Sequence, residues 1–205
     1  MSGMNPISSQ NSSFPLFRQL FALLVSGFLL SAPAGHAQGQ FPPKVEDFSE
    51  STLVISAAKY LGTTAESMAE IMDRVFSQYG IPNAIIRGEE VSAAVVFGLR
   101  YGRGTLEMRS GEQHPIYWRG PSAGVDTGGN AAKSFTLVYG IQNVEEVYSR
   151  FGGADGSAFY LGGVAVSYLQ RGDIVMAPMR AGVGLRAGVS IGYLKFTRES
   201  GWLPF

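Results

Sequence analysis

The sequence feature that most constrains the fold is an alternation of glycine with larger apolar residues near the C-terminus. In "GVGLRAGVSIGYLKF", residues 182–196, every second residue is apolar, and the residues between are mostly glycine with a lone Arg186. A period of two is typical of a β-strand. A membrane helix with small residues at Gly184, Gly188 and Gly192 is the alternative interpretation. However, the run is shorter than about 18 residues and is interrupted by charge, so we predict a strand.

The same period of two dominates the chain from Asn83 onward. Short turn sequences such as "RSGEQ", "TGGN" and "QRGD" separate the strand candidates. Residues 143–153, "NVEEVYSRFGG", instead have helical spacing and end at glycine. The predicted strands are Ala84–Arg87, Val91–Tyr101, Gly104–Met108, Ile116–Arg119, Ala123–Thr127, Lys133–Tyr139, Ser157–Gln170, Ile174–Met179 and Val183–Thr197.

These strands predict a mainly β fold, α+β by content. A sheet that closes on itself has no exposed edges, which favours a closed arrangement. We expect a small antiparallel β-barrel, or a strongly curved sheet, of about eight strands with one short inserted helix. The barrel is expected to span residues 83–198, followed by a tail at 199–205.

An N-terminal helical segment is predicted for residues 51–80. A first helix is expected at 51–61, and Thr63 with Glu66 forms a capping box for a second helix. Gly80 and Pro82 end that helix. Its apolar stripe, which we interpret as packing on a core, consists of Ala65, Met68, Ala69, Met72, Val75, Phe76 and Tyr79.

The first 37 residues have the pattern of a secretory signal peptide. Arg18 precedes an apolar run from Leu20 to Leu30, and small residues before Ala37 fit a cleavage site. The run is shorter than the roughly 20 residues of a membrane-spanning helix. We therefore expect a secreted periplasmic protein with a flexible leader at 38–50 and a single domain at 51–205. The chain has no cysteine, so neither a disulfide nor a lipid attached to cysteine is possible.

The sequence provides no complete set of catalytic groups. Ser122 in "GPSAG" matches a nucleophile elbow, but strand-like residues follow where that motif needs a helix. His114 is the only histidine left after the signal peptide. We predict no enzymatic activity, no metal and no cofactor. The adjacent acids Glu89 and Glu90 would point to opposite faces of a strand. Two carboxylates from different segments could still converge, which keeps a hydrolase open as an alternative. With 16 basic and 16 acidic residues, the charge gives no support for a nucleic-acid partner.

Three arginines beside glycines form the candidate binding site. Arg100, Arg119 and Arg186 are suited to bind carboxylate or phosphate, and neighbouring glycines let a ligand approach the backbone. One hypothesis is therefore an anion-binding face. The other is that the arginines pair across the sheet with acids such as Glu89, Asp126 or Asp173.

Several glycine-anchored blocks resemble the envelope-integrity protein A family of alphaproteobacteria, in the same order along the chain. The blocks are "GEE" (88–90), "GLRYGRGTL" (98–106), "YWRGPSAGVDTGG" (117–129), "LVY" (137–139), "RFGGADGSAF" (150–159) and "GVGLRAGVSIGYLKFT" (182–197). The resemblance implies a secreted periplasmic protein with a small soluble β-barrel and an N-terminal helical segment. It implies a contribution to cell-envelope integrity and no catalytic residue. A weaker likeness to a lipid-binding domain of actin-patch regulators suggests phospholipid head groups as one anion.

We therefore predict a non-enzymatic periplasmic protein that binds or scaffolds an envelope component: an anionic lipid, a glycan or a protein. One alternative is a small outer-membrane β-barrel, suggested by the terminal Phe205 and the alternating strands. The other is a periplasmic hydrolase acting on an envelope polymer.

Overall fold

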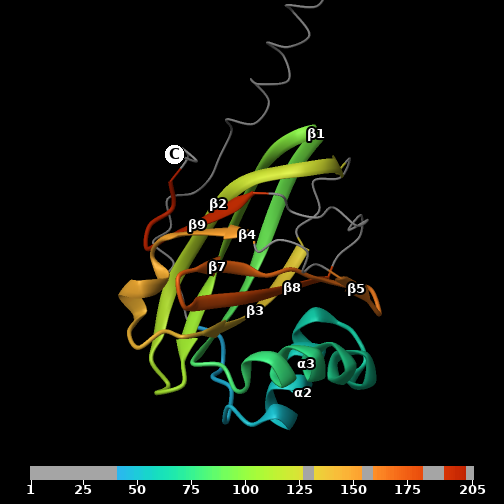
Figure 1. Cartoon of the computed structure of the whole chain (residues 1–205), viewed down its shortest axis with the longest axis vertical. Coiled ribbons are helices and arrows are strands. Elements are labelled where there is room, and N and C mark those ends of the chain that lie inside the picture. Colours follow the sequence, from blue (N-terminus) through green and yellow to red (C-terminus); the bar gives the residue numbers. More distant parts are fainter. Residues whose placement is uncertain (1–40, 127–131, 154–158, 182–191, 202–205) are drawn as a thin grey trace, which may run out of the picture. The chain divides into compact units, whose positions relative to one another are not determined.

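The computed structural model describes residues 41–126, 132–153, 159–181 and 192–201, with only the backbone described for 92–98 and 122–126. In these described ranges two α-helices come first, and a 3₁₀-helix interrupts the strands that follow (Figure 1). The helices are α2 (Glu50–Leu61), α3 (Ala65–Tyr79) and η1 (Val144–Val147). The strands are β1 (Ala84–Met108), β2 (Gln113–Asp126), β3 (Ala132–Tyr139), β4 (Arg150–Gly153), β5 (Phe159–Leu161), β6 (Val164–Val166), β7 (Leu169–Arg171), β8 (Ile174–Ala181) and β9 (Tyr193–Thr197).

Local capping explains where the two α-helices begin and end. The side chain of Ser49 accepts a hydrogen bond from the Thr52 amide at the start of α2, and Gly62 ends that helix in the left-handed conformation at φ 75°. At the start of α3 the cap is Thr64, which accepts from the Ser67 amide, one residue later than the predicted capping box at Thr63. The predicted helical segment is confirmed, with this shift of the cap.

Strand β1 is a single 25-residue element that folds back on itself, where the sequence predicted three separate strands. Its two ends lie side by side: Arg87 Nη2 is 2.6 Å from Glu107 Oε2, and the Arg109 amide donates to the Asn83 carbonyl at 2.9 Å. Gly88 and Gly104 meet between the arms, where a Cβ on either would collide with the backbone of the other arm. Glycine is thus needed at this crossing because it permits close backbone approach.

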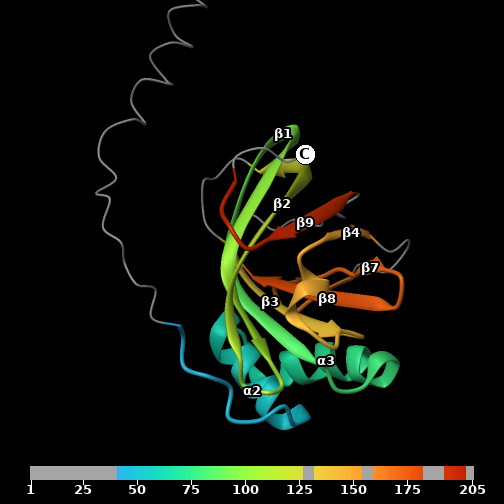
Figure 2. The ribbon, with the colours of Figure 1, turned by 90° about the vertical axis from the view of Figure 1, so that its left-hand side faces the viewer.

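The strands close into an antiparallel barrel. The hydrogen-bonded order is β3-β1-β2-β9-β4-β7-β8, and β8 pairs with β3 to complete the ring, while β6 and β5 extend from β8. Because β1 contributes two arms, eight strands enclose the interior. Figure 2 shows the arms of β1 and β2 rising together beyond the shorter strands. The predicted fold class, a small antiparallel barrel with helices, is confirmed.

Two hydrophobic cores lie on opposite sides of the barrel wall. The outer core packs α2 and α3 against outward-facing residues of β3 and β8, such as Phe135, Leu137 and Met179. The inner core fills the barrel with Ile86, Leu106, Ile116, Val138, Phe151, Met176 and Phe196, among others. Alternate residues of one strand therefore serve different cores, as the period of two requires.

Several parts of the chain differ from the predictions or lie outside the described residues. The described part of the predicted strand Ser157–Gln170 is divided among β5, β6 and β7, and the predicted strands Ile116–Arg119 and Ala123–Thr127 belong, as far as Asp126, to the single strand β2. Only Val144–Val147 of the predicted helix at 143–153 is helical, and Arg150–Gly153 forms β4. In the predicted leader, Phe48 is buried and the Val45 amide donates to Glu107 Oε1 at 2.8 Å, so this segment lies along the barrel. Residues 1–40, with the predicted signal peptide, and most of the opening stretch at 182–191 lie outside the described residues. Within the described part of the chain, no helix has the length and apolar character needed to cross a membrane.

Candidate functional site

The structure describes two of the three arginines of the predicted anion site, and it places them on opposite sides of the sheet. Arg100 lies inside the barrel and is buried, whereas Arg119 lies on the outer face of the neighbouring strand. Arg186 lies outside the described residues. Arg100 pairs in register with Gly120, so Arg119 is one residue away but on the opposite side of the sheet. The two described arginines therefore belong to different sites.

Inside the barrel, Arg100 belongs to a buried polar cluster centred on Glu90. Arg100 Nε and Arg180 Nη1 each lie 3.5 Å from Glu90 Oε1, and Trp118 Nε1 donates to Glu90 Oε2 at 3.1 Å. Arg180 also donates to Ser167 Oγ at 3.0 Å. Arg100 thus contacts Glu90, an acid that the pairing hypothesis did not name. For Arg100, ion pairing is the role that the geometry supports.

On the outer face, strand register brings cations from three strands into one row. Arg119 of β2 lies opposite Lys195 of β9, and Lys195 lies opposite Arg150 of β4. Directly opposed residues of antiparallel strands point to the same face. We call Arg119, Lys195 and Arg150 the basic row. Tyr101 of β1 lies opposite Arg119 and extends the row at one end.

The basic row lowers the stability of the sheet, and folding does not require cations at these positions. Like charges placed directly opposite each other destabilise a sheet. Among the described residues no salt bridge of 4 Å or less involves a member of the row, although the Arg150 guanidinium lies 4.3 Å from the centre of the Tyr193 ring. A bound anion would relieve this repulsion, and arginine is well suited to carboxylate and phosphate.

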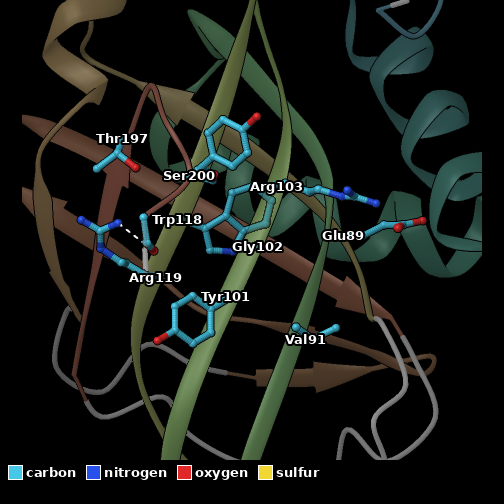
Figure 3. Close-up of a pocket in the computed structure, with 11 residues that line it drawn as sticks. Glu89, Val91, Tyr101, Gly102, Arg103, Trp118, Arg119, Thr197 and Ser200 are labelled. Carbon is cyan, nitrogen blue, oxygen red and sulfur yellow. Dashed lines mark hydrogen bonds between the residues drawn. The ribbon is translucent and has the colours of Figure 1, made fainter. Parts of the chain in front are cut away.

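A hollow of about 520 Å³ lies beside Arg119 on the outer face of β1 and β2. Figure 3 shows the side chains around it, with the hydrogen bond from Arg119 Nη1 to the Gly201 carbonyl, 3.1 Å, drawn as a dashed line. The Nε atom of Arg119 is buried without a hydrogen-bond partner among the described residues. The hollow is lined by Glu89, Val91, Tyr101, Gly102, Arg103, Tyr117, Trp118, Arg119, Thr197, Ser200 and Gly201.

The lining combines two arginines with tyrosine rings and hydroxyl groups, against a single carboxylate, that of Glu89. Apolar walls with a few convergent polar groups are typical of ligand sites. The arrangement can hold an anionic group by charge and a flat or apolar group against the rings. Of its residues the sequence analysis named only Arg119 as a binding residue. Tyr117 was detectable as an outward residue of a predicted strand, whereas Arg103 falls between two predicted strands. Lys195 and Arg150 join them only through long-range register.

The described residues give no support to a catalytic or metal-binding arrangement. Ser122 lies within β2, which continues to Asp126, so the helix that a nucleophile elbow requires does not follow it. His114 lies 3.6 Å from the Glu112 carboxylate and at the far end of β2 from Ser122. Across the described ranges, no three residues of the His, Cys, Asp and Glu types gather as metal ligands would.

The fold and surface define a class of protein: a small closed β-barrel that carries a helix pair on its wall, a polar cluster inside and a row of cations outside. By the match of its residues 46–205 to the family model described as envelope integrity protein A, the chain belongs to that family. The predicted family resemblance is confirmed, and with it an association with the cell envelope.

A solved structure agrees with this placement. It is the crystal structure of a β-barrel-like, uncharacterised protein from Brucella abortus, 38% identical in sequence, with a TM-score of 0.70. The match covers 78% of this chain and 99% of that one. A search of curated proteins gave no match.

Proposed function

We propose that this protein is secreted to the periplasm and supports envelope integrity by binding an anionic envelope component, without catalysing a reaction. The observation that carries the proposal is the basic row beside the hollow. Three opposed cations, with no salt bridge among the described residues, lie next to a site lined with tyrosines. Strand pairing places each cation in the row, so the arrangement belongs to the sheet and not to a loop.

The ligand chemistry is a phosphate or carboxylate group attached to a larger body. Arginine and lysine would bind the charge, and Tyr101 and Tyr117 would contact the attached sugar or acyl portion. Anionic lipids and anionic glycans both present this chemistry in an envelope. The buried Glu90 cluster serves as internal support and does not contact this ligand.

The test measures binding of purified mature protein to vesicles of phosphatidylcholine with and without phosphatidylglycerol, and to isolated peptidoglycan. We expect binding to the anionic vesicles or to the glycan that weakens as salt rises. The variant Arg119→Gln/Lys195→Gln/Arg150→Gln is expected to reduce that binding about tenfold or more. The matched control, Lys44→Gln/Lys59→Gln/Arg109→Gln, removes the same charge at exposed positions outside the row and is expected to bind almost as well.

Equal binding by both triple variants would assign the effect to net charge and overturn the site. Preference for vesicles identifies a lipid source, and preference for peptidoglycan identifies a glycan source. Release of a hydrolysed product from either substrate by the purified protein would overturn the non-enzymatic assignment.

Periplasmic secretion has a separate test. We expect the protein to be recovered in the periplasmic fraction after osmotic shock, with a mature N-terminus after Ala37. Deletion of residues 20–30, the apolar run of the predicted signal peptide, is expected to leave it in the cytoplasm. Recovery only with detergent-extracted membrane would contradict the proposal.

A further inference from the structure

The outer surface of the helix pair carries a groove that is separate from the basic row and shares no residue with it. The groove lies between α2 and α3 and has a volume of about 700 Å³. Its apolar floor includes Val54, Ala65, Ala69 and Phe76, and Ile55 stands beside it with 61% of its surface exposed. Ile55 belongs to the lining, so its exposed side chain extends the apolar surface that the groove offers for contact.

Every charged residue that lines the groove is an acid. Glu50 comes from α2, and Glu66, Glu70 and Asp73 follow one side of α3. The helix macrodipole favours Glu50 and Glu66, which lie in the first turns of their helices. It does not explain Glu70 and Asp73, which lie further along.

The acidic side of α3 opposes helix stability. Glu66 and Glu70 are four residues apart and Glu70 and Asp73 are three apart, and like charges at these spacings repel each other. The charge of Glu70 is compensated by an ion pair, because Arg74 Nη2 lies 3.0 Å from Glu70 Oε1. Both side chains remain more than half exposed. Glu66 and Asp73 have no salt bridge among the described residues.

We infer that this groove docks a basic amphipathic helix of another protein. Charge complementarity selects the occupant: a rim of acids favours lysine and arginine, and the apolar floor accepts a stripe of leucine-like side chains. The groove follows α3 from Ala65 to Phe76, which at about 1.5 Å per residue gives a track of about 16 Å. A partner helix of about three turns covers this track.

A designed peptide tests the inference directly. The probe is a fluorescently labelled peptide of about 14 residues with leucines on one helical face and lysines beside them, at the spacing of an amphipathic helix. Its control has the same composition in an order that spreads the leucines around the helix. We expect the amphipathic peptide to bind the mature protein more tightly than the scrambled one, and binding to weaken with salt.

Paired variants assign that binding to the groove. Ile55→Ser removes an exposed apolar contact, and Glu66→Gln/Asp73→Asn removes two rim charges. Each is expected to weaken binding about tenfold. The control Glu46→Gln/Glu112→Gln removes the same charge at exposed sites outside the groove and is expected to leave binding unchanged. Circular dichroism should show the same helix content in all variants.

Three outcomes would overturn the inference. They are no binding of the amphipathic peptide, equal binding of the scrambled peptide, and insensitivity to both groove variants. Concentration-dependent dimerisation that Ile55→Ser abolishes would instead assign the groove to a second copy of this chain. The triple variant of the basic row is expected to bind the peptide normally, so failure here leaves the proposed anion site untouched.

Discussion

The two cores of this molecule are separated by a single layer of strands, yet they differ in chemistry. The outer core, under the helices, is built from aliphatic, methionine and aromatic side chains. The inner core changes along the barrel axis. Ala84, Val138 and Met176 are paired across β1, β3 and β8 and form one apolar layer. Four residues further along each of these strands, the paired residues are Gly88, Ser134 and Arg180.

This difference in chemistry indicates how each core contributes to the stability of the fold. The outer core buries apolar surface, and volume-conserving changes in such cores are usually tolerated. The polar end of the inner core holds Glu90 and two arginines, all less than a tenth exposed. Moving charged groups out of water costs free energy. The stability of the polar end of the inner core therefore depends on the presence of both the carboxylate and the arginines. We therefore expect the inner core to be the more sensitive to the identity of its residues.

The largest effect is expected from Glu90→Ala. The substitution leaves Arg100 and Arg180 inside the barrel without their shared carboxylate and removes the acceptor of Trp118 Nε1. Loss of one partner from a buried ion pair costs about 3 to 5 kcal/mol. Urea unfolding measures the free energy of unfolding, and Glu89→Ala, the exposed neighbour, is the control, with an expected change within about 0.5 kcal/mol. Similar losses for both variants would mean that the cluster contributes nothing special.

A slightly smaller loss is expected from Leu53→Ala in the outer core. Leu53 is completely buried between α2 and the barrel wall, and its truncation leaves a cavity. Leucine-to-alanine changes at such sites cost about 3 kcal/mol, with a wide range. Leu53→Met, which conserves volume, should retain most of the stability. A Leu53→Met loss as large as that of Leu53→Ala would show that the outer core is as exacting as the inner one.

An intermediate effect is expected from Gly102→Ala. A Cβ at this position would enter the ring of Trp118, whose indole also donates to Glu90. Overpacking of this kind costs about 1 to 3 kcal/mol, since the ring must move. The change should also shift the tryptophan emission maximum. Gly152→Ala is the control, because a Cβ there meets nothing within 4 Å.

The smallest effect, and one specific to the outer core, is expected from Tyr139→Phe at high pH. Burial raises the pKa of Tyr139 above its usual range, with smaller contributions from Tyr168 and Tyr79. The folded state therefore holds the phenol proton more tightly than the unfolded state. Its contribution to stability is complete below about pH 10 and is lost as pH rises further.

Tyr139→Phe should therefore unfold at a higher pH than the wild type. At neutral pH the two proteins should have nearly the same stability, since the Tyr139 hydroxyl has no hydrogen-bond partner among the described residues. Urea unfolding at intervals from pH 7 to 11 checks this. An identical loss for both proteins would assign alkaline unfolding to other groups.

Sequence alone predicted the helices and strands better than the contacts between them. The period of two located the barrel, and helical spacing with a capping box located α3 to within one residue, because these patterns depend on neighbouring residues. The continuity of β1 was missed, although Gly88, Glu90, Arg100, Gly102 and Gly104 share one parity along it. That parity was the available signal for an inward-facing Glu90 next to Arg100.

The candidate site was only partly predictable for the same reason. Arg119 was identified from its own surroundings, but its neighbours Lys195 and Arg150 arrive from strands far along the chain. Their alignment depends on the register of β2, β9 and β4, which side-chain alternation restricts to one parity but does not fix. Arg100 was grouped with Arg119 because both lie beside glycine. In the sheet, however, Arg100 lies opposite Gly120, the neighbour of Arg119, so the two arginine side chains lie on opposite sides of the barrel wall.

The pairing of β3 with both β1 and β8 also has a consequence for how fast the chain reaches this state. Ala84 pairs with Val138 and Lys133 pairs with Ala181, so the two seams beside β3 join segments that are distant in sequence. Barrels dominated by such non-local contacts fold in milliseconds to seconds, far more slowly than helical bundles. Until β3 is placed, β1 and β8 each present an open edge, and the unfolded chain is exposed to association with other unfolded chains during that interval.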